Sequence, residues 1–263
     1  GEILCILGPN GAGKTTLVRQ ITTELIPTSG FVQVLGYDVQ ANPLMVKSLL
    51  GVVPQEASLF GYLTVKQHLR IFAKLRGMSG KDANARTEQL LSELDLNQYR
   101  DVAIDKLSGG LKRRVLVGIA STARPAVIIM DEPTTGLDPR SRRTLWSMLR
   151  GLRDAGSFVL LTTHSMEEAE ALCDRVGIIK GGELVALDTV ENLRAEFNFE
   201  FKLTYHRGNG ISDDQILYGS DDQGLIERAR EMGVNQYSVS RTTLEDIYLT
   251  ITGNLAEVDE SDD

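Results

Sequence analysis

The sequence predicts an α/β fold built around a mostly parallel sheet that is covered on both faces by helices. Short apolar runs recur at residues 3–7, 31–35, 51–53, 127–130, 158–161 and 176–179, and several are separated by segments of helical periodicity. Strands that are apolar throughout are buried on both faces, as in parallel sheets with helical crossovers. A chain of 263 residues buries enough surface to fold without disulfides. We therefore interpret Cys5 and Cys173 as core residues rather than as a redox pair or a metal site.

The charge balance argues against a nucleic-acid-binding protein. Acidic residues outnumber basic residues by 36 to 28, and the last seven residues include five acids. The rest of the chain is only mildly acidic, without the broad basic face of a duplex-binding protein. No apolar run approaches the roughly 20 residues that cross a membrane, and no secretory leader is visible. We expect the chain in the cytosol or at its membrane face. The sequence begins at Gly1-Glu2 and enters the predicted strand at Ile3 directly, which predicts a trimmed N-terminus.

The first helix is predicted after Lys14 and ends at Pro27. Its apolar face is formed by Leu17, Ile21 and Leu25.

Two later helices have clear start signals. One begins with Asp138 as N-cap and Pro139 in the first helical position, and it ends at Gly156. Its inner face is formed by Leu145, Met148, Leu149 and Leu152. The other begins at residues 165–168, Ser-Met-Glu-Glu, which predict a capping box.

The apolar texture divides the chain into domains. Residues 1–195 form the α/β body, and helical periodicity replaces strand runs at about 64–123, which predicts an all-helical insertion. Alternating residues near 199–205 begin a small α+β appendage at 196–253, with a helix near 225–232, a strand near 237–239 and a last helix from 243. The acidic tail 254–263 is predicted to be disordered.

A phosphate-binding motif lies between the first strand and the first helix. Residues 8–15, Gly-Pro-Asn-Gly-Ala-Gly-Lys-Thr, match the pattern G-x-x-x-x-G-K-[ST] and predict a phosphate-loop NTPase core. Glycines let the backbone curl so that N–H groups converge on phosphate oxygens at the start of a helix. We expect Lys14 to reach the β and γ phosphates and Thr15 to bind Mg²⁺. The alternative is a glycine-rich turn that only connects the strand to the helix. The other nucleotide-binding residues assigned to this motif are Gly8, Asn10, Gly11, Ala12, Gly13 and Thr16.

Two adjacent carboxylates end the strand at 127–130, where open parallel sheets bind their ligands. We expect Asp131 to support the Mg²⁺ shell and Glu132 to accept a proton from the attacking water. Two solvated acids at a strand end are the alternative.

A second small polar segment, Ser108-Gly109-Gly110, precedes a predicted helix. Serine and exposed N–H groups at a helix start can bind an anion, although they also form an ordinary N-capped turn. Residues 8–15 already provide one phosphate cradle. A second cradle therefore implies two-sided clamping of a nucleotide or a partner chain.

In order and spacing, these elements resemble the nucleotide-binding domain of ABC transporters. The set comprises the phosphate loop, Gln55 after a strand, Leu-Ser-Gly-Gly at 107–110, Asp131-Glu132, Gly-Leu-Asp at 136–138 and His164 after another strand. The resemblance covers about residues 1–195.

The resemblance implies an ATPase that uses ATP and Mg²⁺ and works as a homo- or heterodimer. Two domains would face head to tail, each ATP lying between one chain's phosphate loop and the other chain's residues 108–110. Gln55 would sense Mg²⁺ and the attacking water, and His164 would hold the γ-phosphate. Asp138 would couple the two sites. The further partner would be a transmembrane permease subunit, which places the chain peripherally at the cytoplasmic face of the cell membrane.

Several segments resemble the drug-resistance and lipid exporter branch, ABC subfamily A and its prokaryotic relatives. Leu111 stands where most family members have glutamine, and the segments 134–139, 164–170 and 243–248 fit this branch. The resemblance implies that the insertion docks the transmembrane subunit just after Gln55. The apolar residues offered there are Leu59, Phe60, Tyr62 and Leu63. The aromatic residue that stacks on adenine in the family would precede Gly1.

Other phosphate-loop proteins fit less well. Chromosome-type ATPases insert a long coiled coil, for which the 93 positions from Lys14 to Leu107 leave no room. Translation-type ATPases carry two cassettes in one polypeptide, and one is visible here. A simple kinase or GTPase does not explain Ser108 to Gly110.

The remaining polar side chains are given structural or solvated roles. His68 and His206 are interpreted as structural or solvated, and Trp146 is expected to pack one helix against the body. The basic residues 112–114 and Arg140, Arg142 and Arg143 are interpreted mainly as solvated helix faces.

Overall fold

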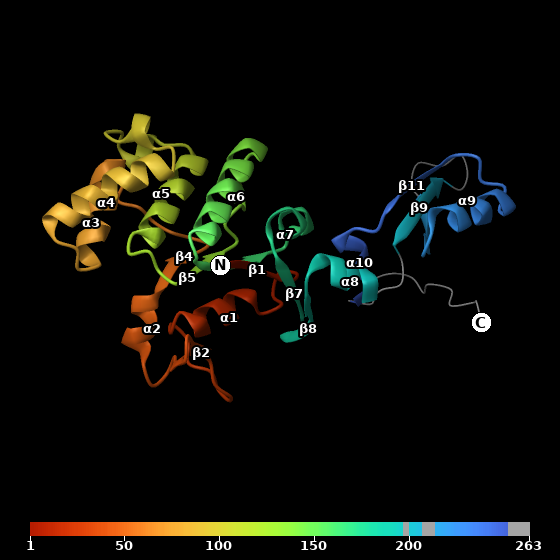
Figure 1. The fold of residues 1–263 in the computed structure, drawn as a ribbon, viewed down its shortest axis with the longest axis horizontal. Coiled ribbons are helices and arrows are strands. Elements are labelled where there is room, and N and C mark those ends of the chain that lie inside the picture. Colours follow the sequence, from red (N-terminus) through yellow and green to blue (C-terminus); the bar gives the residue numbers. More distant parts are fainter. Residues whose placement is uncertain (197–199, 207–213, 252–263) are drawn as a thin grey trace. The chain divides into compact units, whose positions relative to one another are not determined.

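The computed structural model describes residues 1–196, 200–206 and 214–251, and the chain forms two compact units, Gly1–Asp174 and Arg175–Asp263 (Figure 1). The division after residue 195 that the sequence suggests stays a prediction, as does the extent of the helical insertion. Phe199, predicted to start a strand, and the tail 254–263 lie outside the described residues. No helix among the described residues is long and apolar enough to span a membrane.

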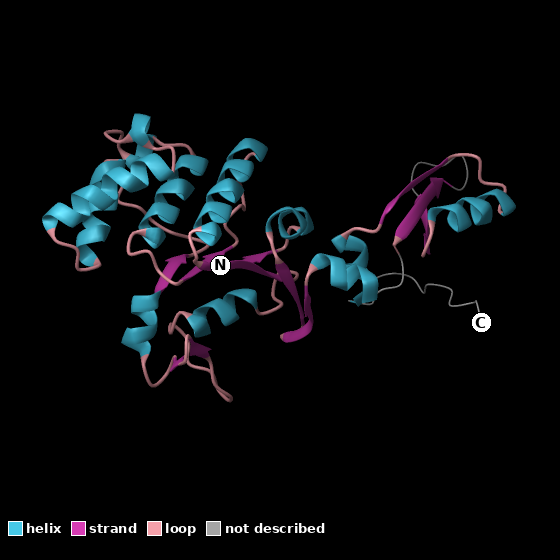
Figure 2. Ribbon diagram, viewed as in Figure 1, coloured by secondary structure: helices cyan, strands magenta, loops and turns pink. Residues whose placement is uncertain are grey.

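The first unit, described throughout, contains a parallel sheet with the strand order β4-β5-β6-β1. The strands are β1 (Glu2–Leu7), β4 (Leu50–Val53), β5 (Val127–Asp131) and β6 (Phe158–Thr163). All residues of β5 are buried, as expected for a central strand that is apolar throughout. Helices α1 and α2 lie on one side of this sheet and α5 and α6 on the other (Figure 2). The predicted mostly parallel α/β core is confirmed.

The predicted start of one helix that packs on the sheet agrees with the structure, whereas the predicted end of another does not. Helix α6 (Pro139–Asp154) begins as predicted, because Asp138 accepts hydrogen bonds from the backbone N–H groups of Arg140 and Ser141, both at 3.0 Å. Helix α1 (Lys14–Ile21) instead ends well before Pro27. Thr23 is left-handed with φ 64°, and Leu25, predicted to face inward, is exposed.

The elements between β4 and β5 are all helical. They are α3 (Val65–Leu75), α4 (Gly80–Glu93), the short 3₁₀ helices η1 (Asn97–Tyr99) and η2 (Ile104–Lys106), and α5 (Gly109–Ser121). Thr64 starts α3 with a capping box, in which it exchanges hydrogen bonds with Gln67. His68 is buried, and its Nε2 accepts a hydrogen bond from the Phe60 N–H at 3.0 Å, so its role is structural.

The apolar run at residues 31–35 does not join the parallel sheet, so that part of the strand prediction is wrong. It contributes β2 (Gln33–Val34), which pairs with β3 (Tyr37–Asp38) in a separate two-stranded antiparallel hairpin, followed by α2 (Pro43–Leu49). Leu35 and Gly36 form its two-residue turn with φ of 49° and 85°, as in a type I′ turn. Phe31 and Leu35 are exposed.

Helix α7 (Met166–Leu172) closes the first unit. Its C-cap residue is Cys173, and both cysteines of the chain are free thiols. Burial, together with contact with Cys173, raises the pKa of the Cys5 thiol. Cys5 is therefore a core residue, as expected, whereas Cys173 is only half-buried.

The second unit begins with an antiparallel hairpin of β7 (Arg175–Lys180) and β8 (Glu183–Asp188), followed by α8 (Val190–Glu196). A three-stranded antiparallel sheet, in the order β10-β9-β11, consists of β9 (Phe201–His206), β10 (Asp214–Gly219) and β11 (Tyr237–Arg241). Helix α9 (Asp222–Glu231) packs on it around Leu203, Tyr205, Leu225 and Ala229. Strand β10 is absent from the sequence-based prediction.

The last helix, α10 (Leu244–Ile251), is tied to that sheet by Asp246. This buried carboxylate accepts hydrogen bonds from Lys202 Nζ at 2.8 and 3.0 Å and from Tyr218 Oη at 3.0 Å. It also accepts from the backbone N–H and the hydroxyl of Thr243, both at 2.7 Å. A single side chain therefore joins α10 to strands β9 and β10.

Candidate functional site

The phosphate loop connects the end of β1 at Leu7 to the start of α1 at Lys14. Gly11 and Gly13 have φ of 82° and 105°, which only glycine adopts without strain. Gly13 is the N-cap of α1 and no side chain caps this end. The first N–H groups of the helix are therefore available to an anion.

The Lys14 side chain is buried inside this loop, with 5% of its surface exposed. Its Nζ donates hydrogen bonds to the carbonyl oxygens of Gly8 at 2.8 Å and Pro9 at 3.1 Å. It also lies 3.6 Å from Oε1 of Glu132. The loop is thus closed around an ammonium group that faces the end of β5.

The two acids at the end of β5 are held by one residue of the neighbouring strand. The Thr162 hydroxyl donates a hydrogen bond to Oδ1 of Asp131 and accepts one from the Glu132 N–H at 3.1 Å. The Thr162 carbonyl accepts from the same N–H. Glu132 has φ of 47°, so the chain turns out of the strand there and the two carboxylates take different directions.

The Glu132 carboxylate collects three donors from three segments. Lys14 approaches Oε1, while Thr135 Oγ1 donates to Oε2 at 3.1 Å and His164 Nδ1 lies 3.4 Å from Oε2. Burial alone would raise the pKa of Glu132, but hydrogen bonds from His164 and Thr135 and the charge of Lys14 hold that pKa below its usual value. Glu132 is therefore ionised at neutral pH.

Other predicted residues lie at the same edge of the sheet. Gln55 is exposed on the loop that follows β4, and β4 is the direct neighbour of β5. Thr15 is half-buried and Thr16 exposed in the first turn of α1. His164 directly follows β6, and its side chain is 52% exposed. It therefore lies on the solvent side of the Glu132 carboxylate.

A second cluster joins the starts of α5 and α6. Ser108 is the N-cap of α5, and its hydroxyl accepts a hydrogen bond from the Leu111 N–H. Ser108 and Gly109 are exposed, whereas Gly110 is buried against Ser141 of α6. Ser141 Oγ in turn donates to Asp138 Oδ2 at 2.6 Å. Hydrogen bonds from Ser141 and from the backbone lower the pKa of the exposed Asp138.

Two polar side chains near these clusters differ from the sequence-based interpretation. Glu168 does not complete a capping box, because the Ser165 N–H donates to Thr163 Oγ1 while the Glu168 carboxylate turns inward. Arg113, interpreted as solvated, donates from Nη1 to the carbonyl of Pro54 at 3.2 Å, next to Gln55. Thr162 was also missed, and the signal for it was a threonine at the end of a buried strand.

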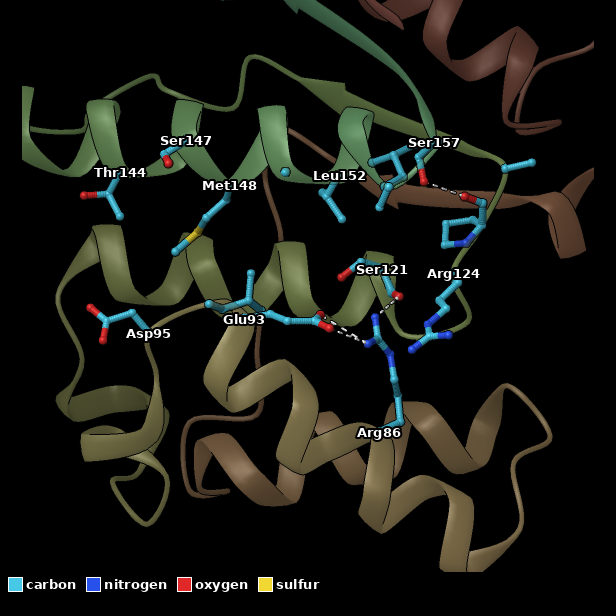
Figure 3. Close-up of a pocket in the computed structure, with 17 residues that line it drawn as sticks. Arg86, Glu93, Asp95, Ser121, Arg124, Thr144, Ser147, Met148, Leu152 and Ser157 are labelled. Atoms are coloured by element: carbon cyan, nitrogen blue, oxygen red, sulfur yellow. Dashed lines mark hydrogen bonds and ion pairs between the residues drawn. The ribbon is translucent and has the colours of Figure 1, made fainter. Parts of the chain in front are cut away.

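A groove of about 760 Å³ lies between α6 on one side and α4 and α5 on the other (Figure 3). None of the predicted site residues lines it. Arg86 crosses its wall and donates to the carbonyl oxygens of Ser121 and Thr122 at the end of α5. Its Nη1 also pairs with Glu93 at 3.1 Å. These contacts satisfy a helix end, so this arginine has a structural role.

A nucleotide cradle beside an acidic pair on a parallel sheet defines a phosphate-loop nucleotide hydrolase, and comparisons with known proteins identify the family. Residues 1–135 match the family described as ABC transporter. The chain is 33% identical to the daunorubicin resistance ATP-binding protein DrrA3 of Streptomyces coeruleorubidus, over 99% of this chain and 90% of that protein. It is 34% identical to the human ATP-binding cassette sub-family A member 2, over 95% of this chain but 12% of that much longer protein.

Solved structures agree with these relatives. An ATP-binding subunit of an ABC transporter superposes with a TM-score of 0.66 at 30% identity, covering 74% of this chain and 82% of that structure. The structure of cbiO1 from Clostridium perfringens, part of the ABC transporter complex cbiONQ, superposes with a TM-score of 0.68 at 26% identity, over 74% and 80% of the two chains. The chain belongs to the ABC transporter family. It is an ATP-binding and ATP-hydrolysing chain of that family.

Proposed function

We propose that this chain is one of two nucleotide-binding subunits that together drive a separate transmembrane exporter of drugs or lipids. The observation that carries the proposal is the presence of two anion-binding devices within one chain. The phosphate loop and Glu132 form one cluster, and the exposed Ser108-Gly109 tip of α5 forms the other. A head-to-tail dimer would bring the tip of one chain to the phosphate loop of its partner. The DrrA and subfamily A relatives favour an exporter of drugs or lipids.

Within the site, Lys14 would exchange its carbonyl contacts in the loop for the β and γ phosphates of ATP. Glu132 would orient the attacking water and accept its proton. The low pKa of the Glu132 carboxyl makes it a weak base in the structure as it stands, but the negative charge of a neighbouring triphosphate would raise that pKa. His164 would hold the γ-phosphate on the exposed side of Glu132.

The oxygen donors at this edge of the sheet fit Mg²⁺. Thr15 offers a hydroxyl, Gln55 an amide oxygen and Asp131 a carboxylate at the end of β5. Mg²⁺ prefers such ligands and is usually held by one or two carboxylates together with substrate phosphates. The described residues contain no cluster of three histidine, cysteine or acidic side chains that would hold a metal by itself. When bound, the ion would neutralise charge on the phosphates.

The second face of the nucleotide would be covered by the partner's α5. The Ser108 hydroxyl and the N–H groups of Gly109 and Gly110 would approach the γ-phosphate from that side. Asp138 is joined through Ser141 to the same turn that packs against Gly110. Asp138 is therefore suited to couple the two sites of the dimer.

We place the chain peripherally at the cytoplasmic face of the membrane, where a transmembrane permease would dock on the loop after Gln55. Phe60 and Tyr62 expose 53% and 79% of their surfaces there. Leu59 and Leu63 are half-buried beside them. The His68 ring fixes the loop by accepting a hydrogen bond from the Phe60 N–H. Exposed aromatic residues on a fixed loop suit a protein partner.

Two substitutions test the proposal in the full-length protein. Glu132→Gln should keep ATP binding and slow turnover by about 10²- to 10⁴-fold, because it removes the general base. This variant should also accumulate an ATP-bound dimer, measured by size-exclusion chromatography. Lys14→Ala should weaken ATP binding itself. Glu167→Gln, an exposed acid on α7, is the matched control and should hydrolyse ATP normally.

Brisk hydrolysis by Glu132→Gln would remove Glu132 from its role as base. Unchanged ATP affinity in Lys14→Ala would count against the phosphate loop, and a monomeric ATP-bound Glu132→Gln would count against the dimer. Copurification with a multi-spanning membrane protein is expected.

A further inference from the structure

Glu168 is a buried acid that the proposed reaction does not use. It lies on α7, four residues after His164, and none of its surface is exposed. Its backbone N–H is capped by the Ser165 hydroxyl at 3.3 Å, while its carboxylate turns into the protein. A buried carboxylate is costly to keep unless its oxygens are satisfied, so its partners indicate why it is there.

Each carboxylate oxygen of Glu168 accepts one hydrogen bond, and the two donors come from different segments. Oε2 accepts from Thr134 Oγ1 at 2.9 Å and Oε1 accepts from Trp146 Nε1 at 3.0 Å. Both donors are themselves buried, with 6% and 7% of their surfaces exposed. Glu168 therefore joins α7, the segment after β5 and the middle of α6.

The Thr134 contact leads directly to the reacting groups. Thr134 lies two residues after Glu132. Residues 132–135 form a turn in which the Thr135 hydroxyl donates a hydrogen bond to Glu132 Oε2. On the other side, α7 begins directly after His164. The segment after β5 and the start of α7 are therefore linked twice. One link is the 3.4 Å contact between Glu132 Oε2 and His164 Nδ1, and the other is the hydrogen bond from Thr134 to Glu168.

We propose that Glu168 is a positioning residue that anchors the segment after β5 and thereby holds Glu132 at its working distance from His164. The proposal rests on the roles proposed above for Glu132 and His164. Glu168 touches neither the nucleotide cradle nor the reacting atoms, so its effect passes through Thr134. A misplacement of about 1 Å in a catalytic group can cost roughly 100-fold in rate. Loss of the contact between Glu168 and Thr134 could therefore slow ATP hydrolysis measurably.

The two hydrogen bonds of Glu168 supply a matched pair of variants. Thr134→Val keeps the shape of the side chain but removes the hydroxyl on the side of Glu132. Trp146→Phe removes the indole N–H on the side of α6. Both leave one oxygen of the same buried carboxylate without its donor, so both should lower the melting temperature.

The two variants should differ in kinetics measured with the full-length protein. We expect Thr134→Val to lower kcat for ATP hydrolysis by about 10- to 100-fold at an ATP KM close to the wild-type value. Trp146→Phe should retain kcat within about twofold, and Thr134→Ser, which restores the hydroxyl, should recover wild-type turnover. Equal kcat in Thr134→Val and Trp146→Phe, at comparable melting temperatures, would overturn the proposal.

Glu168→Gln gives a second measurement, which also decides the matter if Thr134→Val does not fold. The indole N–H fixes the amide oxygen toward Trp146, and the Thr134 hydroxyl then accepts from the amide NH₂. The link survives without the charge, so kcat should stay within about threefold. A folded Glu168→Gln that loses tenfold or more in kcat would overturn a positioning role.

Failure of this inference is distinguishable from failure of the proposed function. If Glu132→Gln hydrolyses ATP at the wild-type rate, the proposed role of Glu132 itself is wrong. If Glu132→Gln is inactive while Thr134→Val is as active as the wild type, only the anchoring role is wrong. Trp146 is the single tryptophan of the chain, so a shift in its fluorescence in Glu168→Leu would report directly on loss of the contact.

Discussion

The two glycines at the start of α5 differ in their surroundings, and this difference predicts opposite responses to the same substitution. A Cβ on Gly110 would lie 2.4 Å from Ser141 Oγ and 2.8 Å from Ser141 Cβ, whereas a Cβ on Gly109 would meet nothing within 4 Å. Ser141 cannot turn aside freely, because its hydroxyl donates to Asp138 at 2.6 Å. We therefore expect Gly110→Ala to strain the contact between α5 and α6.

The magnitude follows from two opposing effects. Alanine is more favourable than glycine by roughly 0.5–1 kcal/mol in the middle of a helix. Gly109 and Gly110 are the first two residues of α5, so the part of this gain that applies in a first turn applies to both. Overpacking costs about 1–3 kcal/mol and applies to Gly110 alone. When the free energies of unfolding of the two variants are subtracted, the contribution of helix propensity cancels. Gly110→Ala should thus be less stable than Gly109→Ala by about 1–3 kcal/mol.

Chemical denaturation of both variants, followed by circular dichroism, measures this difference. The double variant Gly110→Ala/Ser141→Gly removes the clashing atoms. Because Ser141→Gly by itself also loses the hydrogen bond to Asp138, relief of the clash is measured as a favourable coupling energy in a double-mutant cycle with both single variants. If Gly110→Ala is as stable as Gly109→Ala, the contact with Ser141 is not as close as the structure has it. Under the proposed dimer, Gly109→Ala should remain stable but hydrolyse ATP more slowly, because the methyl group faces the partner's nucleotide.

Two further predictions concern single polar contacts. Although burial alone would raise the pKa of Asp246, hydrogen bonds from Lys202 and Thr243 hold it below its ordinary value of 3.8. The stability that Asp246 contributes is therefore present above that value and is lost as pH falls through the lower, folded-state pKa. Hydrogen exchange of β9 and α10 should show an acid-induced loosening that Asp246→Asn lacks, and an identical pH profile in both proteins would refute this. Arg113→Met should lower the free energy of unfolding by about 1 kcal/mol, because it removes the hydrogen bond to Pro54. Lys112→Met is its control, and equal denaturation midpoints in the two variants would contradict the assignment.

Local signals predicted the parts of the fold that local chemistry determines. The phosphate loop forms between β1 and α1 as predicted, because Gly11 and Gly13 adopt the positive φ that its curled backbone needs. Helix α6 begins after Asp138 as predicted, because an N-cap and a following proline act within one turn. The run at 31–35 was misread because an apolar run does not reveal its partner strand. The turn at Leu35 and Gly36 returns the chain on itself and forms a hairpin instead.

Long-range contacts explain what the sequence did not predict at the site. The partners of Glu168 lie 34 and 22 positions away, at Thr134 and Trp146. The local capping pattern therefore predicted the Ser165 N-cap correctly but not the contacts of the Glu168 carboxylate. Arg113 reaches Pro54 across 59 positions. That Lys14 and Glu132 belong to one nucleotide site was expected from their motifs, whereas their direct approach was not predicted. The hydrogen bonds that Thr135 donates to Glu132 and Thr162 donates to Asp131 were not expected. For Thr162 the available signal was its place at the end of a buried strand, whereas Thr135 lies outside any strand.

The Thr162 hydroxyl of β6 contacts both acids at the end of β5, as donor to Asp131 and as acceptor from the backbone N–H of Glu132. Under the roles proposed above for Asp131 and Glu132, the carboxylate beside the cation and the carboxylate beside the attacking water would be held by one side chain. Thr162 would then keep the two acids in a fixed arrangement relative to each other when nucleotide binds.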